Sequence, residues 1–177
     1  MNTKPKIIYI AGAGHSGSTL LDLALTTAPE AFSVGELKHL DEWLRNSAPH
    51  QVDDSGTRPH TSRFWSWFYD NQEHYIPPKR IERSLSFTNR LSVLLTGRPK
   101  TVPKRYYNER LYTDVQAQAE IVHGITPTVI VDSSKVLSRL VELNERTDFD
   151  LYVVHIIRNV QGVVYSHYKH GRSVLHW

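Results

Sequence analysis

Apolar residues along this chain alternate between short β-branched runs and longer stretches with helical spacing. The run 7–11, Ile-Ile-Tyr-Ile-Ala, is continuous and mostly β-branched, which is typical of a strand buried on both faces of a parallel sheet. The pattern predicts three further strands at 31–34, 128–131 and 151–157, and helices at 18–27, 37–45, 64–69, 80–96, 106–123, 137–146 and 160–169. Strand–helix order at both ends therefore predicts an α/β fold with a central parallel sheet and inserted helices.

The middle of the chain interrupts this alternation. Residues 46–63 are rich in Pro, Asp, Ser and His and predict a long loop. The aromatic cluster at 64–69 is better explained as a helical turn that caps the core than as a platform on which a substrate stacks. We expect a single domain over 1–177, with a variable helical insertion at about 46–105.

The composition changes this picture little, but it narrows the function. The chain has 177 residues, 40% hydrophobic and 22% charged, which is enough for one globular core. A net charge of +3 with scattered basic residues fits an anionic small ligand and argues against nucleic acid as a partner. The lack of cysteine excludes disulfides and thiolate metal sites, and a reducing cytoplasm is the simplest location. No apolar run is long enough to span a membrane.

A glycine-rich segment joins the first expected strand to the first helix. Residues 12–19 read Gly-Ala-Gly-His-Ser-Gly-Ser-Thr, the frame of a phosphate-binding P-loop with Ser18 in place of the lysine. Glycines let the backbone approach an anion, and the amides of 15–19 would face it at a helix N-terminus. The frame predicts a P-loop-type three-layer domain. Without the lysine, phosphoryl transfer from ATP is hard to stabilise, so a small kinase is the weaker alternative.

This loop resembles the 5′-phosphosulfate-binding loop of sulfotransferases that use 3′-phosphoadenosine 5′-phosphosulfate (PAPS), with bacterial and carbohydrate-modifying members among them. Family members usually carry Arg or Lys where this chain has His15. The resemblance implies that PAPS is bound, with no metal required, by Gly14, His15, Ser16, Gly17, Ser18, Thr19 and Leu20.

Two later segments extend the resemblance. Arg158 directly follows the strand expected at 151–157, and Ser166 comes eight residues later; this spacing resembles the 3′-phosphate motif of the family, although an arginine there is also common in surface ion pairs. Asp-Ser-Ser-Lys at 132–135 resembles a further family segment, in which Lys135 would neutralise charge in the transition state. Its serines are also candidates to cap the helix at 137–146, and Asp132 is the residue that would hold Mg²⁺ in a kinase.

The catalytic base is expected at Glu36, which follows Gly35 at the end of the second strand. The resemblance implies that this glutamate accepts the proton of the acceptor hydroxyl, while the helix dipole offers a structural reason for an acidic residue at the same place. His39 is the reserve candidate. The expected catalytic set is therefore Glu36 and Lys135, together with His15, whose neutral or partly charged imidazole stands where the family has a cation.

The predicted function is transfer of a sulfonate group from PAPS to a hydroxyl or amine of a small-molecule or carbohydrate acceptor. The resemblance covers about 7–44 and 106–169. It does not cover the middle of the chain, which shapes the acceptor site in the family, so the acceptor is the feature that the sequence predicts least well. The alternatives are the kinase and a non-catalytic nucleotide-binding module. Because sulfotransferases continue well beyond the Arg158–Ser166 motif and only eight residues follow 160–169 here, we expect the C-terminal part to be lacking and part of the donor site to lie open.

Overall fold

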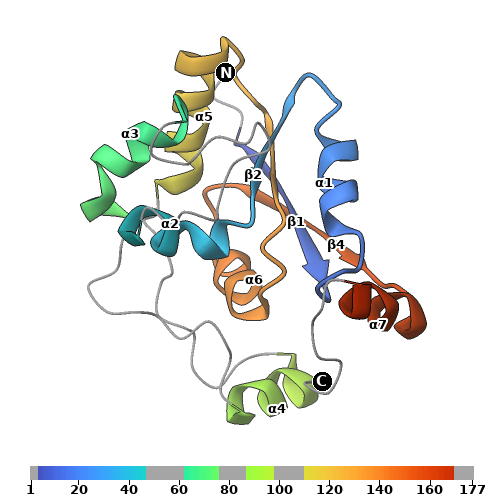
Figure 1. Ribbon diagram of the computed structural model, residues 1–177. Helices are drawn as coiled ribbons and strands as arrows, with labels where there is room; N and C mark the ends of the chain where they lie inside the picture. Colours follow the sequence, from blue (N-terminus) through green and yellow to red (C-terminus); the bar gives the residue numbers. More distant parts are fainter. Residues whose placement is uncertain (1–3, 47–61, 76–86, 98–109, 170–177) are drawn as a thin grey trace.

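A computed structural model of the chain describes residues 4–46, 62–75, 87–97 and 110–169. These residues form a four-stranded sheet with helices packed around it, and every pair of neighbouring strands runs parallel (Figure 1). In spatial order the strands are β2 (Ala31–Gly35), β3 (Val129–Asp132), β1 (Lys6–Gly12) and β4 (Asp150–Ile156). The predicted α/β fold with a central parallel sheet is confirmed.

Helices make the crossovers that a parallel sheet needs. Helix α1 lies on one face of the sheet, while α5 and α6 lie on the other, so the arrangement is consistent with three layers (Figure 1). The helices are α1 (Ser18–Leu25), α2 (Leu40–Asn46), α3 (Trp65–Asp70), α4 (Phe87–Thr96), α5 (Leu111–His123), α6 (Leu137–Asn144) and α7 (Val160–Lys169). Short 3₁₀ turns occupy Leu37–His39 and Gln72–His74.

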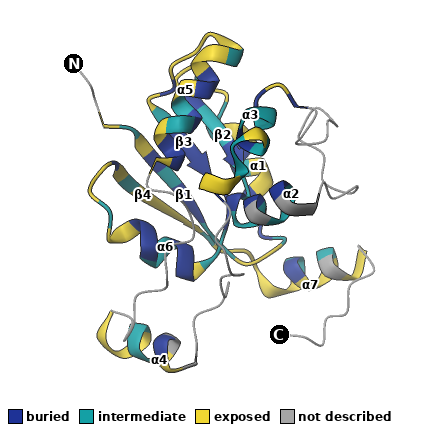
Figure 2. Ribbon diagram, turned by 90° about the vertical axis from the view of Figure 1, so that its left-hand side faces the viewer, coloured by how far each residue is buried: buried dark blue, intermediate teal, exposed yellow. Residues whose placement is uncertain are grey.

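The central strand β1 is buried, as its sequence predicts. Ile7, Tyr9 and Ile10 have no exposed surface, and Ile7 and Tyr9 belong to the main core cluster with residues of α2, α3 and α5. Full burial of each such side chain stabilises the fold by about 1.5–3 kcal/mol. Strand β4 differs, because five of its seven residues are exposed (Figure 2).

Helix α1 differs from its prediction in two ways. It ends at Leu25 and not at residue 27, because the hydroxyls of Thr26 and Thr27 bond to carbonyl oxygens of the last turn, at 2.8–3.2 Å. Its buried face is also shifted: Leu20 is 74% exposed, whereas Asp22 is buried. The helical spacing of Leu20, Leu21, Ala24 and Leu25 predicts a buried apolar face that includes Leu20, whereas the structure turns the carboxylate of Asp22 inward instead.

Parts of some predictions lie outside the described residues. These are the loop at 47–61, the beginnings of the helices predicted at 80–96 and 106–123, and the end of the chain at 170–177. Within the described ranges, α4 begins at Phe87 and α5 at Leu111.

Candidate functional site

The loop between β1 and α1 has the backbone of an anion cradle. His15 and Gly17 both adopt left-handed conformations, with φ of 60° and 99°. Such residues alternating with right-handed ones turn successive N–H groups toward one concave side, and histidine tolerates this region better than most side chains. Gly12, at φ 152°, passes so close to β4 that a Cβ atom there would lie 2.7 Å from the carbonyl oxygen of Ile156. Glycine is therefore required where the loop leaves the sheet.

The loop residues divide into a buried set and an open set. Ser16 and Ser18 are buried beneath the loop, and His15 is half-buried. A Cβ atom added at Gly14 would meet nothing within 4 Å, so the loop is open at this point. Three further residues that are predicted to contact the phosphates are also exposed: Gly17, Thr19 and Leu20.

The segment after β4 and helix α7 bring Arg158 and Ser166, respectively, to this loop. A guanidinium nitrogen of Arg158 donates a hydrogen bond to the carbonyl oxygen of His15 at 3.0 Å, and the Ser166 hydroxyl lies 3.3 Å from Nδ1 of the same histidine. The two residues predicted to read a 3′-phosphate thus meet the loop predicted to hold the 5′ side. Arg158 is exposed.

Gly162 is a site residue that the sequence did not single out. It lies in α7 one turn after Arg158, and a Cβ atom there would be 2.8 Å from Nε of that arginine. A glycine inside a helix costs about 1 kcal/mol relative to alanine, so its position four residues after an arginine was a usable signal. We infer that Gly162 makes room for the Arg158 guanidinium.

Lys135 links the loop to the candidate base. Its Nζ donates a hydrogen bond to Oγ of Ser18 at 3.0 Å and forms an ion pair with Oε1 of Glu36. The backbone of Lys135 is left-handed, with φ 63°, a conformation that costs about 1–2 kcal/mol for a residue with a side chain. Strain of this kind is held in place by surrounding contacts and concentrates at functional sites.

Glu36 lies among two lysines and a histidine. Nζ of Lys38 is 2.5 Å from its Oε2, and Nε2 of His39 is 3.6 Å from the same oxygen. Burial alone would raise the pKa of Glu36, but hydrogen bonds from His39, Lys135 and Lys38 outweigh it and hold the pKa well below its usual range. Glu36 is therefore a carboxylate at neutral pH. Sequence analysis missed Lys38, whose spacing of two residues after Glu36 was the available signal.

Asp132 is fixed in a buried network behind Lys135. Its Oδ2 accepts hydrogen bonds from Nε of Arg139 and from the hydroxyl of Tyr112, both at 2.8 Å, and all three side chains are almost fully buried. Burial raises the pKa of Tyr112 well above its usual range, so its hydroxyl stays protonated and donates. Oδ1 accepts from the backbone N–H and hydroxyl of Ser134. Both oxygens of this carboxylate therefore accept hydrogen bonds within the protein core, and neither lies open to a metal ion.

The predicted helix cap is wrong. Helix α6 is preceded by Val136, and no side chain caps it. The Ser134 hydroxyl instead bonds to Asp132 and accepts a hydrogen bond from the backbone N–H of Lys38 at 3.0 Å. This serine therefore ties the Asp-Ser-Ser-Lys segment to the turn that carries Glu36.

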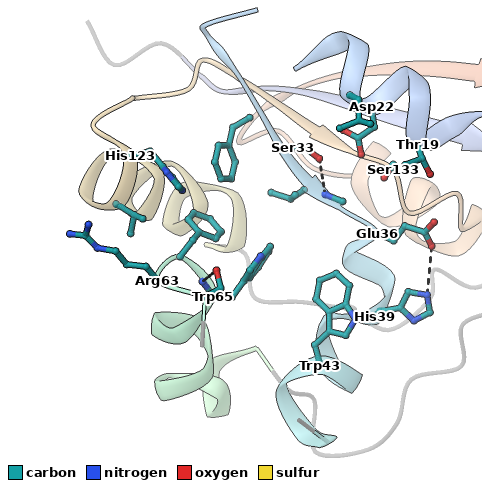
Figure 3. Close-up of a pocket in the computed structure, with 17 residues that line it drawn as sticks. Thr19, Asp22, Ser33, Glu36, His39, Trp43, Arg63, Trp65, His123 and Ser133 are labelled. Carbon is teal, nitrogen blue, oxygen red and sulfur yellow. Dashed lines mark hydrogen bonds and ion pairs between the residues drawn. The ribbon is translucent and has the colours of Figure 1, made fainter. Parts of the chain in front are cut away.

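A pocket of about 570 Å³ opens beside Glu36 (Figure 3). It reaches Thr19 of the glycine-rich loop at one side and aromatic residues of β2, α2 and α3 at the other. The aromatic cluster at 64–69 is divided by it, because Phe68 is in the core, as predicted, while Trp65 lines the pocket. Phe64 belongs to both.

Among the described residues, no helix combines the length and the apolar character needed to cross a bilayer. The same part of the chain contains no group of three or more His, Asp or Glu side chains arranged to hold a metal ion.

Comparison with known proteins adds little to this geometry. No family model and no curated protein matches the chain. One solved structure, described as the structure of a Pnkp1/Rnl/Hen1 complex, is similar to 93% of this chain at 13% identity, with a TM-score of 0.39. The chain spans 40% of the length of that protein. A likeness this distant carries no argument about function.

Proposed function

We propose that this chain binds PAPS and transfers its sulfonate group to a hydroxyl or amine acceptor, and that it does so in the cytoplasm. The observation that carries the proposal is the contact chain Ser18–Lys135–Glu36. Lys135 contacts both the loop that would hold the phosphosulfate and the carboxylate that would take a proton. A purely structural ion pair would not need a strained lysine at the end of a strand.

The fit of the donor to the described residues rests on the glycine-rich loop, on Arg158 after β4 and on Ser166 of α7. The left-handed turns at His15 and Gly17 and the open side at Gly14 suit the 5′ end of the donor. Arg158 and Ser166 provide a fork of donors and a hydroxyl for the 3′-phosphate. His15 joins the two sets, because its carbonyl and its ring contact Arg158 and Ser166.

The proposed chemistry uses this chain's own groups. Glu36 takes the proton of the acceptor as the acceptor oxygen or nitrogen bonds to sulfur. The bond from sulfur to its bridging oxygen breaks, and that oxygen leaves with 3′,5′-adenosine bisphosphate. Lys135, next to Ser18, neutralises the charge that develops there.

The lowered pKa of Glu36 has a consequence for this role. A base works best with a pKa near the working pH, and hydrogen bonds from His39, Lys135 and Lys38 hold the pKa of Glu36 far below it. An anionic donor on the loop would attract Lys135 toward itself and weaken the ion pair with Glu36. The pKa of Glu36 would then rise, so the base would strengthen once the donor is bound.

Thermal unfolding in the presence of nucleotides tests the proposal. We expect 3′,5′-adenosine bisphosphate, with EDTA present, to stabilise the protein more than ATP with Mg²⁺ does. A ligand at a hundredfold excess over its dissociation constant contributes about 2.7 kcal/mol. A larger shift with ATP that depends on Mg²⁺ would contradict the proposal and favour a kinase. Stabilisation by the bisphosphate without transfer of labelled sulfate to any acceptor would leave a binding module.

A further inference from the structure

The pocket beside Glu36 lies apart from the residues assigned to the donor. Of the glycine-rich loop it touches Thr19, and its walls come from α1, β2, α2, α3 and α5. Glu36 is on its surface, with Thr19 and Ser133 nearby (Figure 3). A molecule in this pocket would therefore lie with one end at the proposed base, and about 570 Å³ is enough for a small organic ligand.

The middle of the pocket is an aromatic corner. Phe64 and Trp65 meet edge to face, with ring centroids 4.9 Å apart and planes at 89°, and Trp43 meets Trp65 at 5.9 Å and 72°. Phe32 packs against Phe64 at 4.9 Å. These rings hold one another in place, so they present a preformed apolar wall that favours a flat, apolar ligand.

Two serine hydroxyls on this wall already accept hydrogen bonds within the protein. The Ser33 hydroxyl accepts from the backbone N–H of Gly35 at 3.1 Å, and the Ser62 hydroxyl accepts from that of Trp65 at 3.5 Å. A sugar ring carries a hydroxyl on nearly every carbon, and burying those groups without partners is costly. An aromatic ring has no such need.

Charge is distributed unevenly between the ends of the pocket. Figure 3 shows Glu36 and His39 at one end and Arg63 and His123 at the other, with Trp65 between them. His123 stacks near Phe32 and Phe64 and extends the aromatic wall, whereas Arg63 provides a permanent positive charge. The acidic lining residues, Asp22 and Glu36, lie at the end opposite Arg63, and the two lysines that pair with Glu36 are not among the lining residues. An acidic group on the ligand would therefore be attracted to the Arg63 end.

We infer that the acceptor is a planar aromatic alcohol that carries an acidic group at the end away from its hydroxyl. Its ring lies against the corner of Phe64, Trp65 and Trp43, its hydroxyl meets Glu36, and its acid faces Arg63. This inference rests on the proposed function for the transfer step, in which the aryl oxygen gains the sulfonate and Glu36 gains the proton. Binding of the acceptor itself does not depend on the donor.

Calorimetric titration with two related probes tests the inference without any donor. We expect 6-hydroxy-2-naphthoic acid to bind about threefold to fivefold more tightly than 2-naphthol, because an exposed charge pair contributes up to about 1 kcal/mol. Arg63→Gln should remove this difference and leave 2-naphthol unchanged. Methyl glucoside should not bind measurably at the same concentrations.

Two tryptophans of α3 give a matched pair of variants. Trp65 lines the pocket, whereas Trp67 packs on Phe68 and Tyr75. We expect Trp65→Leu to weaken binding of both naphthyl probes at least tenfold and Trp67→Leu to leave it within about twofold. If Trp65→Leu does not fold, Val122→Phe, which adds bulk to the wall formed by α5, should have the same effect on binding.

The outcomes separate this inference from the proposed function. Equal affinity for the two probes, or tighter binding of methyl glucoside, overturns the inference whatever the donor does. Binding of the naphthoate that responds to Trp65 and Arg63 supports it even where 3′,5′-adenosine bisphosphate fails to stabilise the protein, a result that would overturn the donor assignment alone.

Discussion

The same edge of the sheet carries two candidate anion sites that are built very differently. At the end of β3, Lys135 is held by Ser18 and Glu36, in front of a fully buried pair of Asp132 and Arg139. At the end of β4, Arg158 is exposed and contacts a backbone carbonyl, and most of the strand before it is exposed as well (Figure 2). One half of the site is fixed by packing, and the other lies at the surface.

This difference separates two tasks that the proposed reaction requires. A group that acts on a transition state must be held within a fraction of an ångström, and buried networks provide that precision. A group that captures a phosphate from solution needs charge and access, which an exposed arginine has. We therefore expect changes in the β3 half to affect stability and turnover, and changes in the β4 half to affect donor binding.

The largest effect is expected from breaking the buried network of the β3 half. Asp132→Ala leaves Arg139 buried without its carboxylate, and such a loss costs about 3–5 kcal/mol of the free energy of unfolding. Asp148→Ala is the matched control, because Asp148 pairs with Arg146 at the surface, where such a pair contributes about 0–1 kcal/mol. Urea unfolding of both variants measures the difference. Similar losses would show that the β3 half is not specially fixed.

Glu36→Gln tests the contact between Lys135 and Glu36 at the end of β3. We expect turnover to fall about 10²- to 10⁴-fold, because the variant cannot accept a proton, while binding of 3′,5′-adenosine bisphosphate is kept or tightened as Lys135 and Lys38 are released. Glu42→Gln is the control: Glu42 also contacts His39, at 3.3 Å, but does not line the pocket. Retained turnover in the Glu36 variant would move the base elsewhere, with His39 the next residue to test.

The pH dependence of stability gives this variant a readout that does not need activity. Folding lowers the pKa of Glu36 from its ordinary value of 4.5, so the folded protein binds fewer protons than the unfolded chain. The stabilisation is fully present above about pH 5 and is lost progressively as the pH falls below 4.5. The melting temperatures of the wild type and Glu36→Gln should therefore differ at pH 7 and converge in acid. A constant difference would contradict the ion pairs around Glu36.

The sequence predicted the parts of this molecule that follow from backbone patterns. Continuous β-branched runs identified β1, β3 and β4, a short segment before Gly35-Glu36 identified β2, and glycines marked the turn at 12–17, because these signals are local. The ends of strands in a parallel sheet gather at one edge, so the pattern also placed Lys135 and Arg158 there.

Side-chain pairing could not be predicted in the same way. Asp132 was equally suited to a metal, and Arg139, seven residues later, has the sequence pattern of an ordinary helix residue. The ion pair between Asp132 and Arg139 forms because α5 and α6 bury both side chains. The hydrogen bond from the Tyr112 hydroxyl to Asp132 depends on the same burial. Likewise, the cations around Glu36 come from a 3₁₀ turn and a strained lysine, neither of which has a periodic signal.

Arg158→Ala is expected to act on donor binding alone. Loss of a charged hydrogen-bond donor to a phosphate should weaken binding of 3′,5′-adenosine bisphosphate by about 2 kcal/mol, roughly 30-fold. Binding of 5′-AMP, which lacks the 3′-phosphate, should change much less, and stability should stay within about 0.5 kcal/mol because the side chain is exposed. Calorimetric titration with the two nucleotides measures both. Equal losses would show that Arg158 does not contact the 3′-phosphate.

The smallest effect, and the one that separates the two halves most clearly, is expected from Gly162→Ala. Alanine favours a helix over glycine by about 1 kcal/mol, so the variant should be slightly more stable than the wild type. The new Cβ atom, however, would lie 2.8 Å from Nε of Arg158, and the flexible arginine must shift to avoid it. We therefore expect 3′,5′-adenosine bisphosphate to bind about threefold more weakly to a protein that is more stable. In an Arg158→Ala background, the same change should leave binding unaltered, because the group that it displaces is absent. An equal loss in both backgrounds would mean that Gly162 acts on the loop or on the helix itself, and its role in placing Arg158 would have to be abandoned.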